Sequence, residues 1–182
     1  ADARTLYGAH TIKILDVDEG GNVQFAVYGY MNRGRHEGEV GIQLYTYNSS
    51  LNTTEELIYI PYNRTYAVLK AEMEQLLYLN REQKLYLTLE DAVYRIDLTE
   101  KKCQQLLLIR SDGMLQVSDN HKIAVWPERE DISHSTSMII RNLSSDTRNV
   151  IAVEEGEAIR PLGFMGEDII YGVAYTVDVT ED

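Results

Sequence analysis

The stretch GYMNRGRHEGEVGI, residues 29–42, places charged side chains and an imidazole among four Gly residues. An imidazole titrates near neutral pH, so His36 with Glu37 beside it has the residue types of a general base. Neighbouring residues rarely hydrogen-bond in the orientation that this chemistry needs. Two other interpretations remain open: a binding loop that uses Arg33, Arg35, His36 and Glu37, or a solvated turn between two strands.

A second long polar loop, PEREDISHSTS at 127–137, carries a similar set of side chains: Glu128, Arg129, Glu130, Asp131 and His134. Loops that are distant in sequence form a binding surface when a rigid β scaffold presents them on one side. The sequence therefore predicts a binding face built from both loops, and the alternative is again a pair of solvated hairpin loops.

Motifs for other kinds of chemistry are absent from the sequence. The four His residues have no H-x-H or H-E-x-x-H spacing, and there is no G-x-S-x-G, G-x-G-x-x-G or P-loop string. DVDEGGN, residues 16–22, partly resembles a calcium loop but lacks the bidentate Glu, so it is better explained as a tight turn with Gly20 or Gly21 at positive φ. We predict no catalytic residue, no metal site and no cofactor in this chain.

Composition narrows the class of partner. The net charge is -12 and the pI is about 4.7, with scattered basic residues, which argues against binding to nucleic acid or to an anionic membrane surface. No apolar run approaches the length of a membrane span, so membrane insertion of this segment is not expected. Cys103 is the only cysteine, which excludes an intramolecular disulfide.

Four N-x-[ST] sequons, at Asn48, Asn52, Asn63 and Asn142, would be glycosylation acceptors in a eukaryotic secreted protein. The alternative is that these Asn residues serve as turn formers between strands. The sequons favour an extracytoplasmic protein, secreted or membrane-anchored, and the single thiol is compatible with either side of a membrane.

Alternation of apolar and polar residues at period two dominates the chain and predicts about fourteen short strands. Their ranges are 11–18, 22–30, 41–47, 56–61, 74–80, 84–89, 92–98, 103–109, 114–118, 122–126, 137–143, 149–153, 160–164 and 168–175. Helical spacing occurs only in 65–77, where Tyr66, Leu69, Met73 and Leu76 or Leu77 share a face. EQLLYLN at 74–80 competes for the end of this helix.

The strands repeat in groups. Short apolar segments at 25–27, 85–87, 123–125 and 169–173 each follow a polar turn, and steps of 60, 38 and 48 residues separate them. A period of about 40–50 residues with four antiparallel strands is typical of propeller blades. The alternation of turns and strands in LYLNREQKLYLTLEDAVYRIDL and QVSDNHKIAVWPE…SMIIRNL resembles that of the irregular bacterial β-propellers of the dipeptidyl-peptidase N-terminal and TolB-like kinds.

The resemblance implies an all-β fold of antiparallel four-stranded blades. We expect a single β-propeller-like domain over residues 1–182, an arc or partial propeller of about four blades cut from a longer protein. In a second arrangement, strand 11–18 completes the last blade of a small ring. The connection from the innermost to the second strand emerges on one face in every blade, so the loops 31–39 and 127–137 are expected on a common face.

Propellers of this kind serve in binding or scaffolding more often than in chemistry, so the resemblance implies a non-enzymatic protein-interaction or sensing module. Its partner would be another protein or the remainder of the same polypeptide. One alternative is the non-catalytic propeller portion of a larger hydrolase. A weaker alternative is a carbohydrate-binding module that uses exposed Tyr45 or Tyr47.

Overall fold

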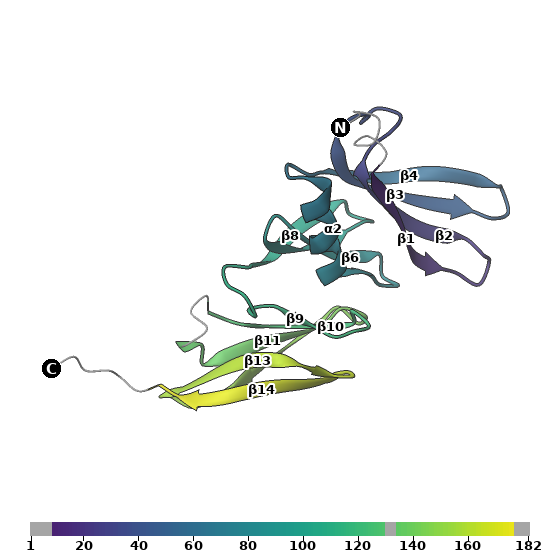
Figure 1. Cartoon of the computed structure of the whole chain (residues 1–182). Coiled ribbons are helices and arrows are strands. Elements are labelled where there is room, and N and C mark those ends of the chain that lie inside the picture. Colours follow the sequence, from purple (N-terminus) through teal and green to yellow (C-terminus); the bar gives the residue numbers. More distant parts are fainter. Residues whose placement is uncertain (1–8, 130–133, 177–182) are drawn as a thin grey trace. The chain divides into compact units, whose positions relative to one another are not determined.

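The computed structural model of the chain describes residues 9–129 and 134–176 (Figure 1). Sheet A consists of β1 (His10–Val17), β2 (Val23–Tyr30), β3 (Val40–Asn48) and β4 (Thr53–Pro61). The helix α2 (Tyr66–Gln75) leads to sheet B, which consists of β5 (Leu77–Leu79), β6 (Lys84–Leu89), β7 (Ala92–Asp97) and β8 (Lys102–Leu108). Sheet C consists of β9 (Gln116–Val117), β10 (Ile123–Pro127), β11 (Ser137–Asn142) and β12 (Thr147–Ala152), and sheet D of β13 (Glu157–Met165) and β14 (Asp168–Tyr175).

Neighbours in sequence are neighbours in every sheet, so each sheet is an up-and-down meander. The prediction of an all-β fold with antiparallel four-stranded sheets and one short helix is confirmed, and each of the fourteen predicted strands overlaps a strand of the described chain. Two details differ. Strand 11–18 belongs to the first sheet, because β1 pairs with β2. The segments 25–27, 85–87 and 123–125 lie on the second strand of their sheets, not on the first.

The contacts of the chain divide it into two compact units. One comprises Ala1–Leu79 with Gln83–Leu106, and the other comprises Asn80–Glu82 with Leu107–Asp182. A single domain over residues 1–182, arranged as an arc of blades, would require a particular placement of these two units relative to each other. That expectation therefore stays a prediction.

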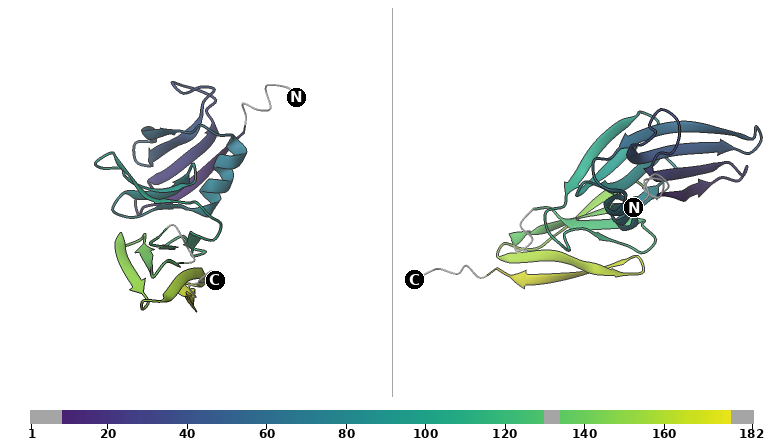
Figure 2. Two further views of the ribbon diagram at one scale, coloured as in Figure 1. Left: turned by 90° about the vertical axis from the view of Figure 1, so that its left-hand side faces the viewer. Right: turned by 45° about the horizontal axis from the view of Figure 1, so that its top comes forward.

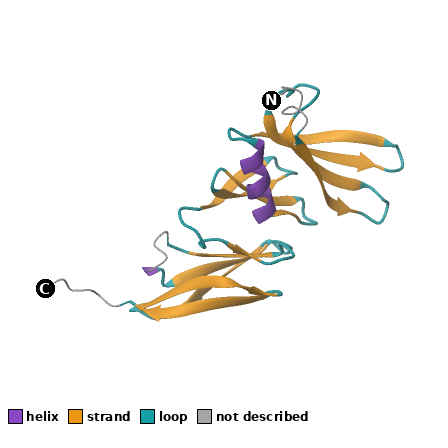
Figure 3. Cartoon of the chain, viewed as in Figure 1, coloured by secondary structure: helices purple, strands orange, loops and turns teal. Residues whose placement is uncertain are grey.

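The helix of the first unit forms where the sequence predicts it. Leu69 and Met73 are buried, and α2 packs against β2 and β6 (Figures 2 and 3). The helix ends after Gln75 because Leu76 takes an extended conformation and Leu77 begins β5. Strand formation therefore wins the competition for EQLLYLN, since β5 aligns Leu77 and Leu79 with Leu87 and Leu85 of β6 in the core of the unit.

A buried carboxylate ties α2 to the tight turn between β6 and β7. Glu90 and Asp91 both have positive φ, 53° and 62°, a backbone conformation that Asn-Gly turns adopt more easily. The Glu72 carboxylate, only 9% exposed, accepts hydrogen bonds from both backbone N–H groups, at 3.0 and 3.3 Å. The helix therefore supplies hydrogen bonds that the turn needs to hold a conformation its own residues disfavour.

The second unit has a smaller core. Val125, Met138 and Ile159 are fully buried, and Phe164 and Ile169 of the β13–β14 hairpin pack against them. Sheets C and D therefore pack on each other through apolar faces, as sheets A and B do in the first unit.

Candidate functional site

Sheet A has one face in the core of the first unit and one face that is open. Tyr28 and Ala26 of β2 pair with Ile42 and Leu44 of β3, and all four are buried. The opposite side, here called the outer face, is made of three rows across the sheet: Ile12–Val27–Gln43–Tyr59, Ile14–Phe25–Tyr45–Glu56 and Val17–Val23–Tyr47–Thr54.

The outer face is apolar along β1 and β2, and β3 adds the rings of Tyr45 and Tyr47 beside Gln43. Ile12, Ile14 and Val17 are 62%, 64% and 56% exposed. Beside them, the rings of Phe25 and Tyr45 stack with centroids 5.0 Å apart. Isolated exposed apolar residues are ordinary on a protein surface, whereas a contiguous apolar patch marks an interaction site. These residues form such a patch, because they are aligned on adjacent strands.

The loop 31–39 folds onto the end of this outer face. The imidazole of His36 stacks on the ring of Tyr59, with centroids 3.6 Å apart and planes 11° from parallel. Its Nδ1 lies 3.0 Å from Oε2 of Glu39. The hydrogen-bond partner of His36 is therefore Glu39 rather than its neighbour Glu37, which differs from the pair that the sequence suggested for a general base.

The backbone closes this loop tightly. Met31 and Glu39 are linked by an N–H···O bond of 2.9 Å, and Gly38 donates to the Met31 carbonyl at 2.8 Å. Gly34 and Gly38 have φ of 85° and 86°, which side-chain-bearing residues rarely adopt. The loop is thus an ordered hairpin connection that borders the apolar patch, with Arg33 and Arg35 exposed to solvent.

Tyr59 is the anchor of the loop. Its hydroxyl donates to the Val40 carbonyl at 3.4 Å. Burial, together with the neighbouring Glu39 carboxylate, raises the pKa of Tyr59 from 10.0 to about 12. Gly41 is required beneath this ring, because a Cβ there would lie 2.5 Å from the Tyr59 hydroxyl.

The residues of the second predicted loop lie in the second unit. The Glu128 carboxylate accepts hydrogen bonds from the Ser137 hydroxyl and from Arg148, and the Arg129 backbone N–H donates to Ser135. His134 is exposed, and Asp131 lies outside the described residues. Because the two loops belong to different units, the common face of 31–39 and 127–137 stays a prediction.

Turn-forming roles are observed for several polar residues. Asp18 accepts hydrogen bonds from the backbone and side chain of Asn22, both at 2.8 Å, and Gly21 has φ of 76°. The interpretation of 16–22 as a tight turn is confirmed. The side-chain oxygens of Asn48 and Asn142 likewise accept backbone N–H groups two or three residues ahead. Hairpin turns therefore explain these two sequons locally, and glycosylation stays a prediction.

No group of three or more His, Cys, Asp and Glu side chains within 9–129 and 134–176 is placed to hold a metal ion. Within the same ranges, no helix has the length and apolar character of a membrane span.

Comparisons with known proteins add little. No protein-family model matches the chain, and no curated protein is significantly similar to it in sequence. Among solved structures, the chain is similar to an oligogalacturonate lyase from Vibrio parahaemolyticus, with 9% identity and a TM-score of 0.34. The match covers 94% of this chain and 55% of the lyase chain, so this chain spans about half the length of that protein. Similarity at this level carries no information about activity.

Proposed function

We propose that this chain is a non-enzymatic protein-interaction module of the β-propeller-like kind, and that the outer face of sheet A is its contact surface. The observation that supports the proposal most is the contiguous apolar patch on β1 and β2, around Ile12, Ile14 and Phe25. The occupant is another apolar β-sheet face, from a protein partner or from the remainder of the same polypeptide.

The internal packing of the two units supports this choice of occupant. Sheet A packs on sheet B, and sheet C on sheet D, through faces of Ile, Leu, Val and Met. The outer face of sheet A presents the same kind of side chains to solvent. Face-to-face sheet packing is therefore the association that this chain already uses twice.

The free energy at stake is substantial. Complete burial of one Ile or Val side chain stabilises by about 1.5–3 kcal/mol. Covering Ile12, Ile14 and Val17, each more than half exposed, would contribute about 3–5 kcal/mol before the entropic cost of association. Such a gain suits a specific protein contact, and the net charge of -12 limits non-specific association elsewhere on the surface.

We place the module outside the cytoplasm, secreted or membrane-anchored. This part of the proposal is supported by the four sequons, which are glycosylation acceptors in secreted eukaryotic proteins. Mass spectrometry of protein isolated from its source organism, with cell fractions analysed separately, tests it. Recovery only from the cytoplasmic fraction would contradict it.

The contact surface is tested by site-specific photocrosslinking in the source organism. A photoreactive amino acid is placed at Ile14, and a control at Val68, which is 38% exposed on α2 and lies off the outer face. We expect position 14 to give one discrete crosslinked species in which mass spectrometry identifies a protein segment. Intermolecular and intramolecular crosslinks distinguish a partner from the remainder of the same polypeptide. No discrete product at position 14, or the same product at both positions, would refute the proposal.

A further inference from the structure

The face of sheet A that enters the core changes character along its length. In β2 the residues on this face run from Tyr28 and Ala26 to Gln24, and in β3 from Ile42 and Leu44 to Thr46. β4 follows the same change, from Ile60 and Ile58 to Glu55, whereas β1 is polar along this face. A polar row therefore crosses all four strands: Asp16–Gln24–Thr46–Glu55. This row lies beyond the apolar core, on the side of the sheet opposite to the outer face.

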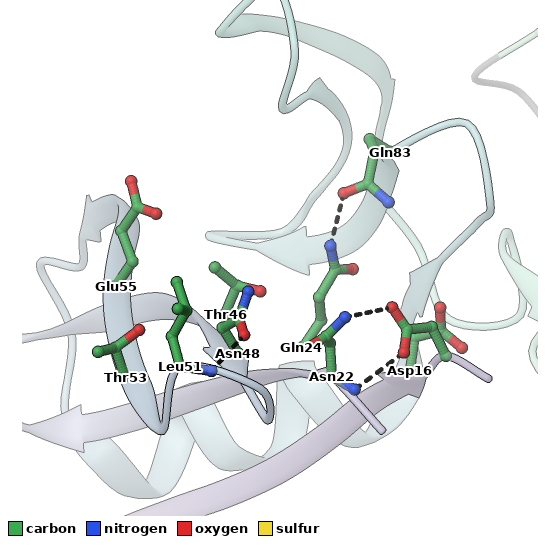
Figure 4. Close-up of a pocket in the computed structure, with 10 residues that line it drawn as sticks. Asp16, Asn22, Gln24, Thr46, Asn48, Leu51, Thr53, Glu55 and Gln83 are labelled. Atoms are coloured by element: carbon green, nitrogen blue, oxygen red, sulfur yellow. Dashed lines mark hydrogen bonds between the residues drawn. The ribbon is translucent and has the colours of Figure 1, made fainter. Parts of the chain in front are cut away.

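This polar row lines a groove formed by two cavities that share residues. One cavity of about 340 Å³ is lined by Asp16, Asp18, Asn22, Gln24, Thr46, Asn48, Leu51, Thr53, Glu55 and Gln83 (Figure 4). A second cavity of about 290 Å³ shares Gln24, Thr46, Glu55 and Gln83 with it and continues to Leu98, Thr99 and Lys101 of the β7–β8 turn. Each volume is close to or within the range of about 300–1,000 Å³ that small-molecule sites occupy.

Some lining residues are already used to hold the turns. Asp18 and Asn22 bond to each other, Asn22 also accepts from the Ser49 backbone, and Asn48 accepts from Leu51. These groups shape the end of the groove.

The polar row itself retains hydrogen-bonding capacity. Within the described residues, the side chains of Asp16, Thr46 and Glu55 have no hydrogen-bond partner. Gln24 donates to Gln83 at 2.8 Å, but its own Oε1 is buried and accepts nothing in the described structure. In Figure 4, Gln24 and Glu55 project from the same side of sheet A, and Gln83 reaches toward Gln24 from the β5–β6 turn.

We propose that this groove binds a neutral oligosaccharide. A sugar hydroxyl both donates and accepts, so it can satisfy the carboxylates of Asp16 and Glu55, the Gln24 carbonyl, the Thr46 hydroxyl and the free amide hydrogens of Gln83. Neighbouring strands lie about 4.8 Å apart, so the row spans about 14 Å, enough for more than one sugar ring. Leu51, Leu57 and Leu98 offer apolar surface to the C–H faces of the rings.

Charge selects among sugars. Asp16, Asp18 and Glu55 line the two cavities, and Lys101 is the one cation among the described residues that line them. An anionic oligosaccharide such as a uronic acid oligomer would be repelled, so the ligand carries no carboxylate or sulfate. The site is also distinct from Tyr45 and Tyr47, which lie on the outer face and which the sequence had suggested as sugar contacts.

The test uses the ¹⁵N-labelled chain titrated with neutral oligomers of glucose, xylose and N-acetylglucosamine, and with oligogalacturonate as the anionic arm. We expect saturable amide shifts at Gln24, Thr46, Glu55 and Gln83 with at least one neutral oligomer. Oligogalacturonate should bind at least tenfold more weakly than that oligomer.

Two matched variants sharpen the test. Thr46→Val removes a hydroxyl from the groove and keeps the shape of the side chain, and loss of one hydrogen bond should weaken binding about threefold to tenfold. Thr54→Val makes the same change on the outer face of β4 and should leave binding unchanged. The proposal is overturned if every neutral oligomer leaves these amides unshifted, if shifts centre on Tyr45 and Tyr47, if both variants weaken binding equally, or if oligogalacturonate binds as tightly as the neutral oligomers.

Discussion

Replacing Glu72 with Gln should destabilise the first unit, because one buried carboxylate accepts four hydrogen bonds. The donors are the Tyr62 hydroxyl at 2.7 Å, the Glu90 and Asp91 backbone N–H groups at 3.0 and 3.3 Å, and Arg64 at 3.4 Å. Two donors meet each oxygen. A glutamine side chain keeps one acceptor oxygen and turns its NH₂ group toward the other two donors.

The expected loss follows from this geometry. A hydrogen bond to a charged group contributes about 1.5–3 kcal/mol. The glutamine would turn its amide nitrogen toward the donors of the two longer bonds, Asp91 and Arg64, because losing these bonds costs less than losing the two shorter ones. We therefore expect Glu72→Gln to lower the free energy of unfolding by about 2–3 kcal/mol. For a chain of this length, that corresponds to a fall in Tm of about 4–12 °C.

Two measurements check this prediction. Urea unfolding followed by circular dichroism gives the free energy of unfolding, and amide hydrogen exchange reports the turn directly. The Glu90 and Asp91 amides should exchange faster in Glu72→Gln. The control is Glu74→Gln on the same helix. The Glu74 carboxylate is 67% exposed and makes a long ion pair with Lys70, at 3.9 Å, so the free energy of unfolding should change by no more than about 0.5 kcal/mol. Equal effects of the two variants would refute the reasoning.

Three further predictions concern the hairpin loops and the pH dependence of stability. Gly41→Ala places a Cβ 2.5 Å from the Tyr59 hydroxyl, so it should lower the free energy of unfolding by about 1–3 kcal/mol and shift the His36 ring resonances. Gly20→Ala is the control and should do neither, since its Cβ meets only Asp18 at 3.3 Å and Asn22 at 3.5 Å. The Glu100 backbone N–H, together with Lys84, holds the pKa of Asp97 below its usual 3.8. This carboxylate therefore stabilises the fold above about pH 4, and that stability is lost as pH falls through the lowered pKa. Asp97→Asn should reduce the loss of stability at acid pH, measured by urea unfolding. The pKa of Tyr59 is raised to about 12 by burial and Glu39, so its contribution is complete below pH 10 and is lost as pH rises toward 12; an unchanged alkaline limb in Tyr59→Phe would contradict this.

Strands and the helix were predictable because they depend on local periodicity. The alternation in KLYLTL predicted 84–89, and β6 occupies those residues. The helix over 66–75 follows from the spacing of Leu69 and Met73 on one face. Both signals arise within a few residues and require no knowledge of tertiary contacts.

The two candidate surfaces were not predictable, because bulges change which side chains share a face. Counting by two from Ile14 would put Asp16 on the outer face, but the register shifts between these residues and Asp16 pairs with Gln24 on the groove side. A second bulge in β4 moves Glu55, rather than Glu56, onto the polar row. Neither bulge follows a Gly or Pro that would announce it in the sequence.

Exposure of the outer face was also hidden from the sequence. Ile12 and Ile14 have the spacing of core residues, and alternation alone does not say which face of a sheet is covered. The stacking of His36 on Tyr59 joins positions on different strands and loops, so no local motif reports it. Finding either feature would have required information on which residues far apart in the sequence lie in contact.

The central claim is that the outer face of sheet A is a protein contact surface. The most direct test is the dissociation constant for the protein segment captured at position 14, measured for the unchanged chain, Ile14→Lys and Val68→Lys. Loss of an apolar contact and burial of a charge should weaken binding by Ile14→Lys at least tenfold, while Val68→Lys leaves it unchanged. Equal affinities for all three chains would contradict the account.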